Sequence, residues 1–191
     1  MNYVTKFFVL LFNWSISVFS SPFDLIHSDV WWPSFVATKW GSWYYVLFID
    51  DHTRYCWAYL IKYCSEFFEI YTAFRALVKT QHSAVIKCLR CNLGREYTSN
   101  KFYQLFTLDR TIHQTSCTDT PEQNEVAEKK HMHIVKTTHS LLLFAFIPNM
   151  FWRKVILTVV SLNNTILFFS FSHSLDSDGI GDWSIDDVFS Y

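Results

Sequence analysis

Hydrophobic and polar residues alternate with a period of two in the first third of the chain. Over 23–31 this alternation puts Phe23, Leu25, His27 and Asp29 on one face of a predicted short strand. The aromatic and branched runs 43–50 and 54–61 flank a polar "DDHT" stretch, which predicts a β-hairpin. Asp50 and Asp51 are expected to serve the turn, because Asp side chains bond nearby backbone there.

Helical periodicity begins at about residue 65. A helix is predicted over 65–80, with Ser65 as N-cap and an apolar stripe of Phe67, Ile70, Phe74, Leu77 and Val78. A strand over 84–91, a short helix over 100–108 and a strand over 111–117 follow. A long helix over 122–146, with Val126, Ile134, Leu141 and Leu142 facing inward, ends before Pro148, and a last helix is predicted over 150–165.

This order of elements predicts an α/β fold with a mixed five-stranded sheet flanked by helices. Three leading strands joined by short turns, followed by strands alternating with helices, are typical of such a sheet. We expect one domain over 21–167, a hydrophobic N-terminal extension over 1–20 and a polar, acidic tail over 168–191 that packs poorly.

Composition narrows the class of protein only slightly. Half of the 191 residues are hydrophobic, which is ample for a core, and the net charge of −1 does not indicate a nucleic-acid binder. The odd number of cysteines, five, favours reduced thiols and an intracellular protein. Cys88 and Cys91 form a CxxC, but on a strand positions i and i+3 face opposite sides, which argues against a zinc site.

Two segments leave a membrane or secreted location open. Residues 1–22 place an apolar run after Lys6, much like a signal peptide. Residues 155–172 carry no charge, yet Asn163 and Asn164 near their centre are costly in lipid.

Three polar residues, Asp29, Asn92 and Glu128, fall at the ends of predicted elements, with 35 residues between the last two. Around them the motifs "FDLIHSDVWWP", "YYVLFIDDHTRYCWAYL", "RCNLGREYTSNKF" and "TPEQNEVAEKKHMHIV" resemble the integrase core of Ty1/copia-type LTR retrotransposons. The resemblance runs from about residue 21 to about residue 166.

The resemblance implies an RNase H-like fold and an Asp-Asp-Glu set that holds two divalent metals, Mg²⁺ or Mn²⁺, for DNA integration. Asp29 then matches the first ligand and Glu128 the third, while Asn92 stands where the second Asp is expected. Asn has one neutral carbonyl oxygen and bridges two cations poorly, so we predict an essentially inactive strand-transfer enzyme, a pseudoenzyme. The family's glycines are replaced by Trp32, Arg95 and Glu125, and bulky side chains strain a turn that needs positive φ.

Ordinary structural roles compete with these assignments. A lone Asp, Asn or Glu at the end of a helix or strand is usually a cap or turn residue. For Asn92 we favour a present role as a loop residue. Gln123 and Asn124 match the family loop that approaches DNA, but they also suit a helix start. The remaining candidates for nucleic-acid contact are Lys129, Lys130 and Lys136, which equally suit a solvated helix face.

Three functions remain open. The first is a catalytically impaired integrase-core descendant, with DNA and a second copy of the chain as partners, no small-molecule substrate, and a place in the cytoplasm or nucleus. The second is a non-enzymatic nucleic-acid-binding remnant of a transposable element. The third is a secreted or membrane protein that uses the hydrophobic N-terminus.

Overall fold

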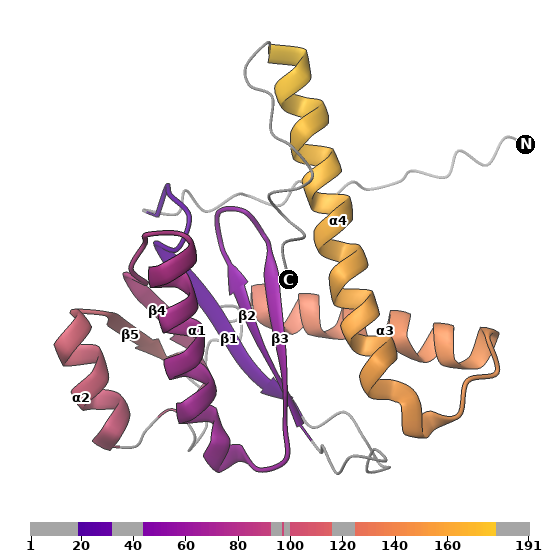
Figure 1. The fold of residues 1–191 in the computed structure, drawn as a ribbon, viewed down its shortest axis with the longest axis horizontal. Helices are drawn as coiled ribbons and strands as arrows, with labels where there is room; N and C mark the ends of the chain where they lie inside the picture. The colour runs from indigo at the N-terminus through magenta and orange to yellow at the C-terminus, as the bar shows by residue number, and fades with distance from the viewer. Residues whose placement is uncertain (1–18, 32–43, 93–96, 98–99, 116–124, 179–191) are drawn as a thin grey trace, which may run out of the picture.

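The computed structural model describes residues 19–31, 44–92, 97, 100–115 and 125–178, with side chains of the last helix as far as Phe168. Figure 1 shows strands and helices in the predicted order. The strands are β1 (Leu25–Trp31), β2 (Tyr44–Asp50), β3 (Cys56–Ile61), β4 (Cys88–Cys91) and β5 (Ile112–Thr115). The helices are α1 (Phe67–Gln81), α2 (Asn100–Asp109), α3 (Glu125–Phe144) and α4 (Trp152–Asp178), and 3-10 turns at Cys64–Glu66 and Asn149–Phe151 precede α1 and α4.

The five strands form one mixed sheet in the order β3-β2-β1-β4-β5, which confirms the predicted fold class. β1, β2 and β3 pair antiparallel, whereas β4 and β5 run parallel to β1. The parallel pairs place the carboxyl ends of β1, β4 and β5 at one edge of the sheet. Polar residues at these strand ends are therefore brought together.

One face of the sheet packs against α1 and α2. Ile26, Phe48 and Leu89 from the strands share a buried cluster with Phe74 of α1 and Phe102 of α2. The rings of Phe48 and Phe74 stack with centroids 4.3 Å apart. Aromatic pairs of this kind stabilise a core beyond the area they bury.

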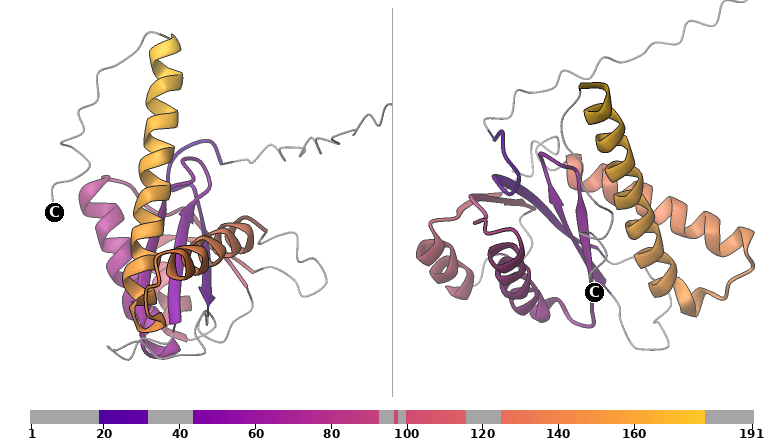
Figure 2. Two further views of the ribbon diagram at one scale, coloured as in Figure 1. Left: turned by 90° about the vertical axis from the view of Figure 1, so that its right-hand side faces the viewer. Right: turned by 45° about the horizontal axis from the view of Figure 1, so that its top comes forward.

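The opposite face packs against α3 and α4. Tyr45 and Leu47 alternate with Phe48 along β2 and so point away from α1, into a second cluster with Ile134 of α3 and Ile156 of α4. Figures 1 and 2 show α1 and α2 on one side of the sheet and α3 and α4 on the other, with the far part of α4 extending past the strands.

Asn164 fixes α4 to the edge of the sheet. β3 is an edge strand, and the Asn164 amide bonds both the N–H and the carbonyl of its first residue, Cys56. The Cys56 N–H donates to Asn164 Oδ1 at 3.1 Å, and Asn164 Nδ2 donates to the Cys56 carbonyl at 2.8 Å. The buried Asn164 in the apolar helix α4 is thus explained by its hydrogen bonds to the backbone of β3.

The apolar run 155–172, which contains Asn164, lies within α4. Within the described residues, no helix combines the length and apolar character needed to cross a bilayer. The hydrophobic segment 1–18 lies outside the described residues, so the predicted signal peptide stays a prediction.

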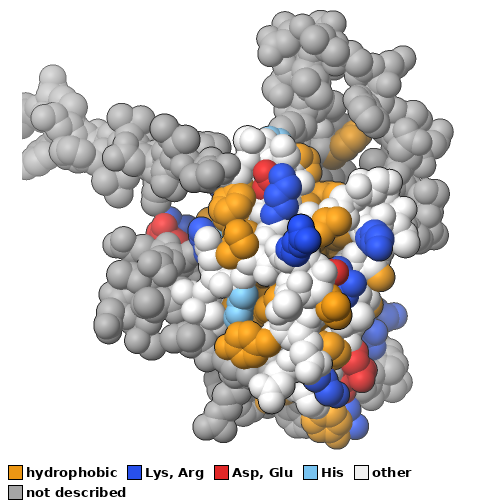
Figure 3. Space-filling model, turned by 90° about the vertical axis from the view of Figure 1, so that its left-hand side faces the viewer, with side chains coloured by type: hydrophobic (Ala, Val, Ile, Leu, Met, Phe, Trp, Pro, Cys, Tyr) orange, Lys and Arg blue, Asp and Glu red, His pale blue; other side chains and the backbone are white. Residues whose placement is uncertain are grey.

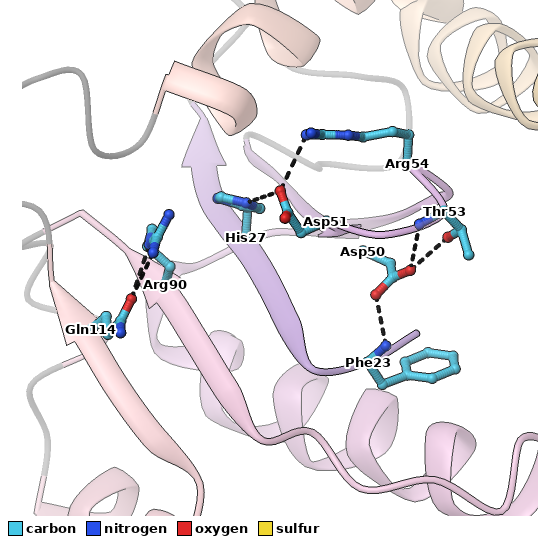
Figure 4. A network of polar contacts seen from close by, with 8 residues as sticks. All are labelled: Phe23, His27, Asp50, Asp51, Thr53, Arg54, Arg90 and Gln114. Atoms are coloured by element: carbon cyan, nitrogen blue, oxygen red, sulfur yellow. Dashed lines mark hydrogen bonds and ion pairs between the residues drawn. The ribbon is translucent and has the colours of Figure 1, made fainter. Parts of the chain in front are cut away.

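The turn between β2 and β3 forms as predicted around Asp50. Its carboxylate is fully buried and accepts hydrogen bonds from the Thr53 N–H at 2.8 Å and the Thr53 hydroxyl at 2.7 Å. The Phe23 N–H donates to its other oxygen at 2.7 Å. Asp50 therefore joins the hairpin turn to the start of β1 (Figure 4).

Four details of the predicted elements are wrong. The predicted strand 84–91 begins only at Cys88. Ser65 does not cap α1 but lies exposed in the 3-10 turn, which the Lys62 N–H ties down by donating to Glu66. Phe23 leaves the face shared by His27 and Asp29, since its φ of 66° breaks the alternation before β1 begins. The last helix runs past the predicted end at 165 to Asp178, through Leu167.

Candidate active site

Asp29 lies near the carboxyl end of β1 and is buried, with 5% of its surface exposed. It pairs with Leu47 of β2 in the sheet register. Because side chains alternate along a strand, Asp29 shares a face with His27, opposite the cluster that holds Ile26. The first predicted ligand therefore sits on the α3 side of the sheet.

Asn92 follows the last residue of β4, the strand parallel to β1. Its side-chain Nδ2 donates a hydrogen bond to Asp29 Oδ1 at 2.9 Å. The sheet thus brings together the first two members of the predicted set, as the parallel pairing requires. The uncharged amide acts on the Asp29 carboxylate as a donor, whereas a carboxylate at this position would be a second acceptor.

Tyr97, five residues after Asn92, packs into the core on the α1–α2 side of the sheet. Tyr97 is fully buried, and its hydroxyl is 3.1 Å from Ser28 Oγ on β1. Its ring packs edge-on against Phe67 of α1, with centroids 4.5 Å apart. Residues 93–96, including Arg95, lie outside the described part of the chain.

Glu128 lies in the first turn of α3, on its exposed side, next to the fully buried Ala127. α3 packs along β1 and β2, so its first turn is held near the sheet. Among the described residues, no three His, Cys, Asp or Glu side chains are grouped so that they could hold a metal ion. The structure therefore joins Asp29 to Asn92, while the position of Glu128 as a third metal ligand stays a prediction.

The predicted nucleic-acid residues differ in their surroundings. Lys129 pairs with Glu125 one turn earlier on α3, Lys130 is half-buried, and Lys136 is exposed. Gln123 and Asn124, and likewise Trp32, lie outside the described residues. Glu125 is helical and not among the positive-φ residues, so the strain predicted at this former glycine position does not arise there.

Figure 3 shows the side of the molecule that faces left in Figure 1. Lys and Arg side chains are spread among hydrophobic ones there rather than gathered into one patch. This distribution agrees with the net charge of −1 and offers individual contacts to an anionic partner rather than a broad basic surface.

A buried histidine that the sequence interpretation missed lies behind the site. His131 of α3 is 1% exposed and lies between two rings, Tyr45 at 4.5 Å and Trp31 at 4.3 Å between centroids. Neither ring nitrogen of His131 has a hydrogen-bond partner among the described residues, and burial lowers its pKa to about 3. Burial, and secondarily the nearby Asp29 charge, raises the pKa of Tyr45. The inward face of α3 is Ala127, His131, Ile134, Thr138 and Leu142, while the predicted Val126 and Leu141 are only partly buried.

A second histidine, His27, stands one step before Asp29 on the same face of β1. Its Nε2 is 2.9 Å from Asp51 Oδ1, and Arg54 Nη1 lies 3.3 Å from the same oxygen (Figure 4). Asp51 thus bonds His27 and Arg54 rather than the turn backbone that Asp50 serves. The His27 hydrogen bond lowers the pKa of Asp51, whereas burial lowers the pKa of His27.

Two solved structures that share this arrangement of strands and helices come from retroviral integrases. A chain of the cryo-EM structure of the simian T-cell lymphotropic virus intasome in complex with PP2A regulatory subunit B56 gamma matches with a TM-score of 0.57 at 14% identity, over 73% of this chain and 47% of that chain. The HTLV-2 integrase catalytic core domain, solved in complex with magnesium in a dimeric form, matches with a TM-score of 0.51 at 16% identity, over 73% of this chain and 84% of that chain. The protein therefore has the RNase H-like fold of integrase catalytic cores.

Sequence comparison identifies the relatives. The chain is 35% identical over 141 residues to the retrovirus-related Pol polyprotein from transposon TNT 1-94 of Nicotiana tabacum. It is 34% and 31% identical, over 145 and 164 residues, to those from transposons RE1 and RE2 of Arabidopsis thaliana. No family model matches the chain.

These matches make the chain a homologue of Ty1/copia-type retrovirus-related Pol polyproteins, as its motifs predict. The alignments cover 74–86% of this chain but only 10–11% of each polyprotein. The homology thus concerns one segment of those long proteins.

Proposed function

We propose that this protein is an integrase-core descendant that binds nucleic acid but does not carry out strand transfer. The observation that carries the proposal is the hydrogen bond from Asn92 Nδ2 to Asp29 Oδ1. An acidic pair at this place would repel unless a cation lay between the two side chains. An amide beside a carboxylate needs no cation, because the amide itself supplies the positive hydrogen.

The donor set around Asp29 does not fit a two-metal centre. Mg²⁺ and Mn²⁺ prefer anionic oxygens, and two adjacent dications need carboxylates that bridge or neutralise them. Asn92 contributes at most one neutral oxygen, and its amide occupies an oxygen of Asp29. Glu128, the third carboxylate of the predicted set, is exposed in the first turn of α3.

Nucleic-acid binding is the part of the family's function that these losses do not remove. Contacts to phosphates depend on Lys and Arg rather than on metal ligands, and they position the protein without reading sequence. Lys130 and Lys136 are not held in any described ion pair, while Glu125 draws Lys129 away from an incoming phosphate. The likeness to an intasome chain and to a dimeric catalytic core supports DNA and a second copy of the chain as partners, in the cytoplasm or nucleus.

A DNA nicking and end-joining assay in Mg²⁺ and in Mn²⁺ tests the proposal. It compares the unmodified chain with Asn92→Asp, and uses Asn92→Asp combined with Asp29→Asn as the matched inactive control. The proposal predicts DNA retention by all three proteins and joining, if any, by Asn92→Asp alone. Joining by the unmodified chain at the rate of Asn92→Asp overturns the loss of strand transfer, and failure of the unmodified chain to retain DNA overturns the binding.

A further inference from the structure

Three polar side chains form a row across the sheet, one step away from Asp29 and Asn92. His27 of β1 pairs in register with Arg90 of β4, and Arg90 pairs with Gln114 of β5. Consecutive side chains on one face of a strand are about 7 Å apart, so the row lies next to the candidate site. Figure 4 shows His27, Arg90 and Gln114 on neighbouring strands.

This row faces away from α1 and α2. Leu89 and Cys91, which flank Arg90 along β4, belong to the cluster on the α1–α2 side. His113, which precedes Gln114, packs its ring against Phe106 of α2 at 4.8 Å. The apolar cluster of α3 and α4 on the opposite face includes no described residue of β4 or β5. This face of β4 and β5 therefore carries the polar pair Arg90 and Gln114 next to the pair Cys88 and Ile112.

Arg90 is held by two hydrogen bonds and, within the described part of the chain, forms no ion pair. Its Nε and Nη2 both donate to Gln114 Oε1, at 3.1 and 2.9 Å, and its side chain is only half-buried. Arg54, Arg75, Lys87 and Lys129 each pair with a carboxylate, whereas Arg90 forms no such pair with any described residue. A guanidinium has five N–H donors, and two suffice for Gln114, so three remain for a ligand.

The charges around Arg90 permit an anion there. Asp51 is the carboxylate of the neighbouring network, and its charge is shared between His27 and Arg54. Asp29, one step along β1, is bonded by the Asn92 amide. Arg90 acts on the Asp51 carboxylate only through its longer-range charge, and a neutral amide is its hydrogen-bond partner among the described residues. A guanidinium that is oriented in this way, without an ion pair, suits a phosphate.

We propose that Arg90, positioned by Gln114, binds a backbone phosphate of a nucleic-acid strand that crosses the β4–β5 end of the sheet. This inference rests on the proposed nucleic-acid binding and adds the contact that makes it. Arg90 supplies the charge and the paired N–H groups, whereas Gln114 is a positioning residue that fixes the plane of the guanidinium.

The test is binding of a fluorescently labelled DNA duplex, followed by anisotropy over a series of KCl concentrations. Loss of one phosphate contact reduces the slope of log K against log salt by about 0.9. Arg90→Gln is expected to show this change together with a roughly three- to tenfold weaker affinity at low salt. Gln114→Leu keeps the charge, so its slope should stay while its affinity falls by about twofold to threefold. Arg110→Gln removes an exposed arginine beyond α2 and is expected to bind as the unmodified chain does.

The results distinguish failure of the Arg90 phosphate contact from failure of nucleic-acid binding as a whole. Retention of DNA with the same slope and affinity in Arg90→Gln overturns the phosphate contact and leaves the proposed binding intact. No salt-dependent retention by the unmodified chain overturns the proposed binding and this contact with it. Thermal melting shows whether Arg90→Gln is folded. If it is not, Arg90→Lys is used instead, because Lys keeps the charge but lacks the paired N–H groups of the guanidinium. An affinity of Arg90→Lys equal to that of the unmodified chain then contradicts the contact.

Discussion

Asn164 of α4 bonds both the N–H and the carbonyl of Cys56, so a helix side chain completes the hydrogen bonding of an edge strand. The Cys56 thiol also donates to Asn164 Oδ1 at 3.3 Å, and burial raises the pKa of that thiol to about 11. Edge strands expose unpaired backbone groups, and covering them with a helix prevents pairing with another chain. The contact therefore fixes α4 and protects the sheet.

Replacing Asn164 with Leu is expected to lower the free energy of unfolding by about 2–4 kcal/mol, because two buried backbone groups lose their partners. Asn163→Leu is the matched control, since Asn163 bonds only the Val159 carbonyl within its own helix. Urea unfolding of both variants checks the prediction. Equal losses for the two substitutions would show that Asn164 does not act through Cys56.

A second prediction concerns the buried carboxylate of Asp50 in the turn between β2 and β3. Asp50→Ala leaves the N–H groups of Phe23 and Thr53 without their acceptor, and it is expected to cost about 2–4 kcal/mol of unfolding free energy. Asp51→Ala, on the partly exposed neighbour, should cost less. Chemical denaturation of both variants measures the difference, and a larger loss for Asp51→Ala would contradict the role given to Asp50.

Burial of His131 is expected to make the free energy of unfolding depend on pH. Its pKa in the folded state, about 3, lies below the ordinary value of 6.5, so the unfolded state binds more protons between these values. The free energy of unfolding should therefore be fully developed above pH 6.5 and fall as pH drops below it, by about 1–2 kcal/mol at pH 5.

His131→Phe is expected to remove most of that loss between pH 6.5 and 5, because Phe fills the space between Tyr45 and Trp31 without a titrating group. The exposed His133, changed to Gln, serves as the control and should leave the profile unchanged. Thermal melting across this pH range measures both. An unaltered profile in His131→Phe would assign the pH dependence to other groups, such as the buried His27.

The sequence pattern predicted the strands and helices, and from their order the mixed sheet, because strands and helices each follow the spacing of hydrophobic residues along the chain. Alternation along 44–50 and helical spacing along 67–81 determine which residues form strands and helices, whatever their partners. The resemblance around Asp29 and Asn92 also predicted their common place, since β1 and β4 end at the same edge of the sheet.

Side-chain partners could not be read in the same way. The pairing of Asn164 with Cys56 spans 108 residues and depends on how α4 rests on β3. His131 lies on the polar-looking "EKKHMH" stretch, and the rotation of α3 against β2 buries it instead of Val126. An apolar stripe predicts the side of a helix that is buried but not which neighbouring position is central.

The central claim is that Asn92, through its hydrogen bond to Asp29, replaces the metal ligand that an integrase core needs at this place. Calorimetric titration of Mn²⁺ into the folded chain and into Asn92→Asp tests this without requiring DNA or any further domain. We expect Asn92→Asp to bind Mn²⁺ at least about tenfold more tightly than the unmodified chain, a difference of about 1.4 kcal/mol. Equal Mn²⁺ affinity in the two proteins would contradict it.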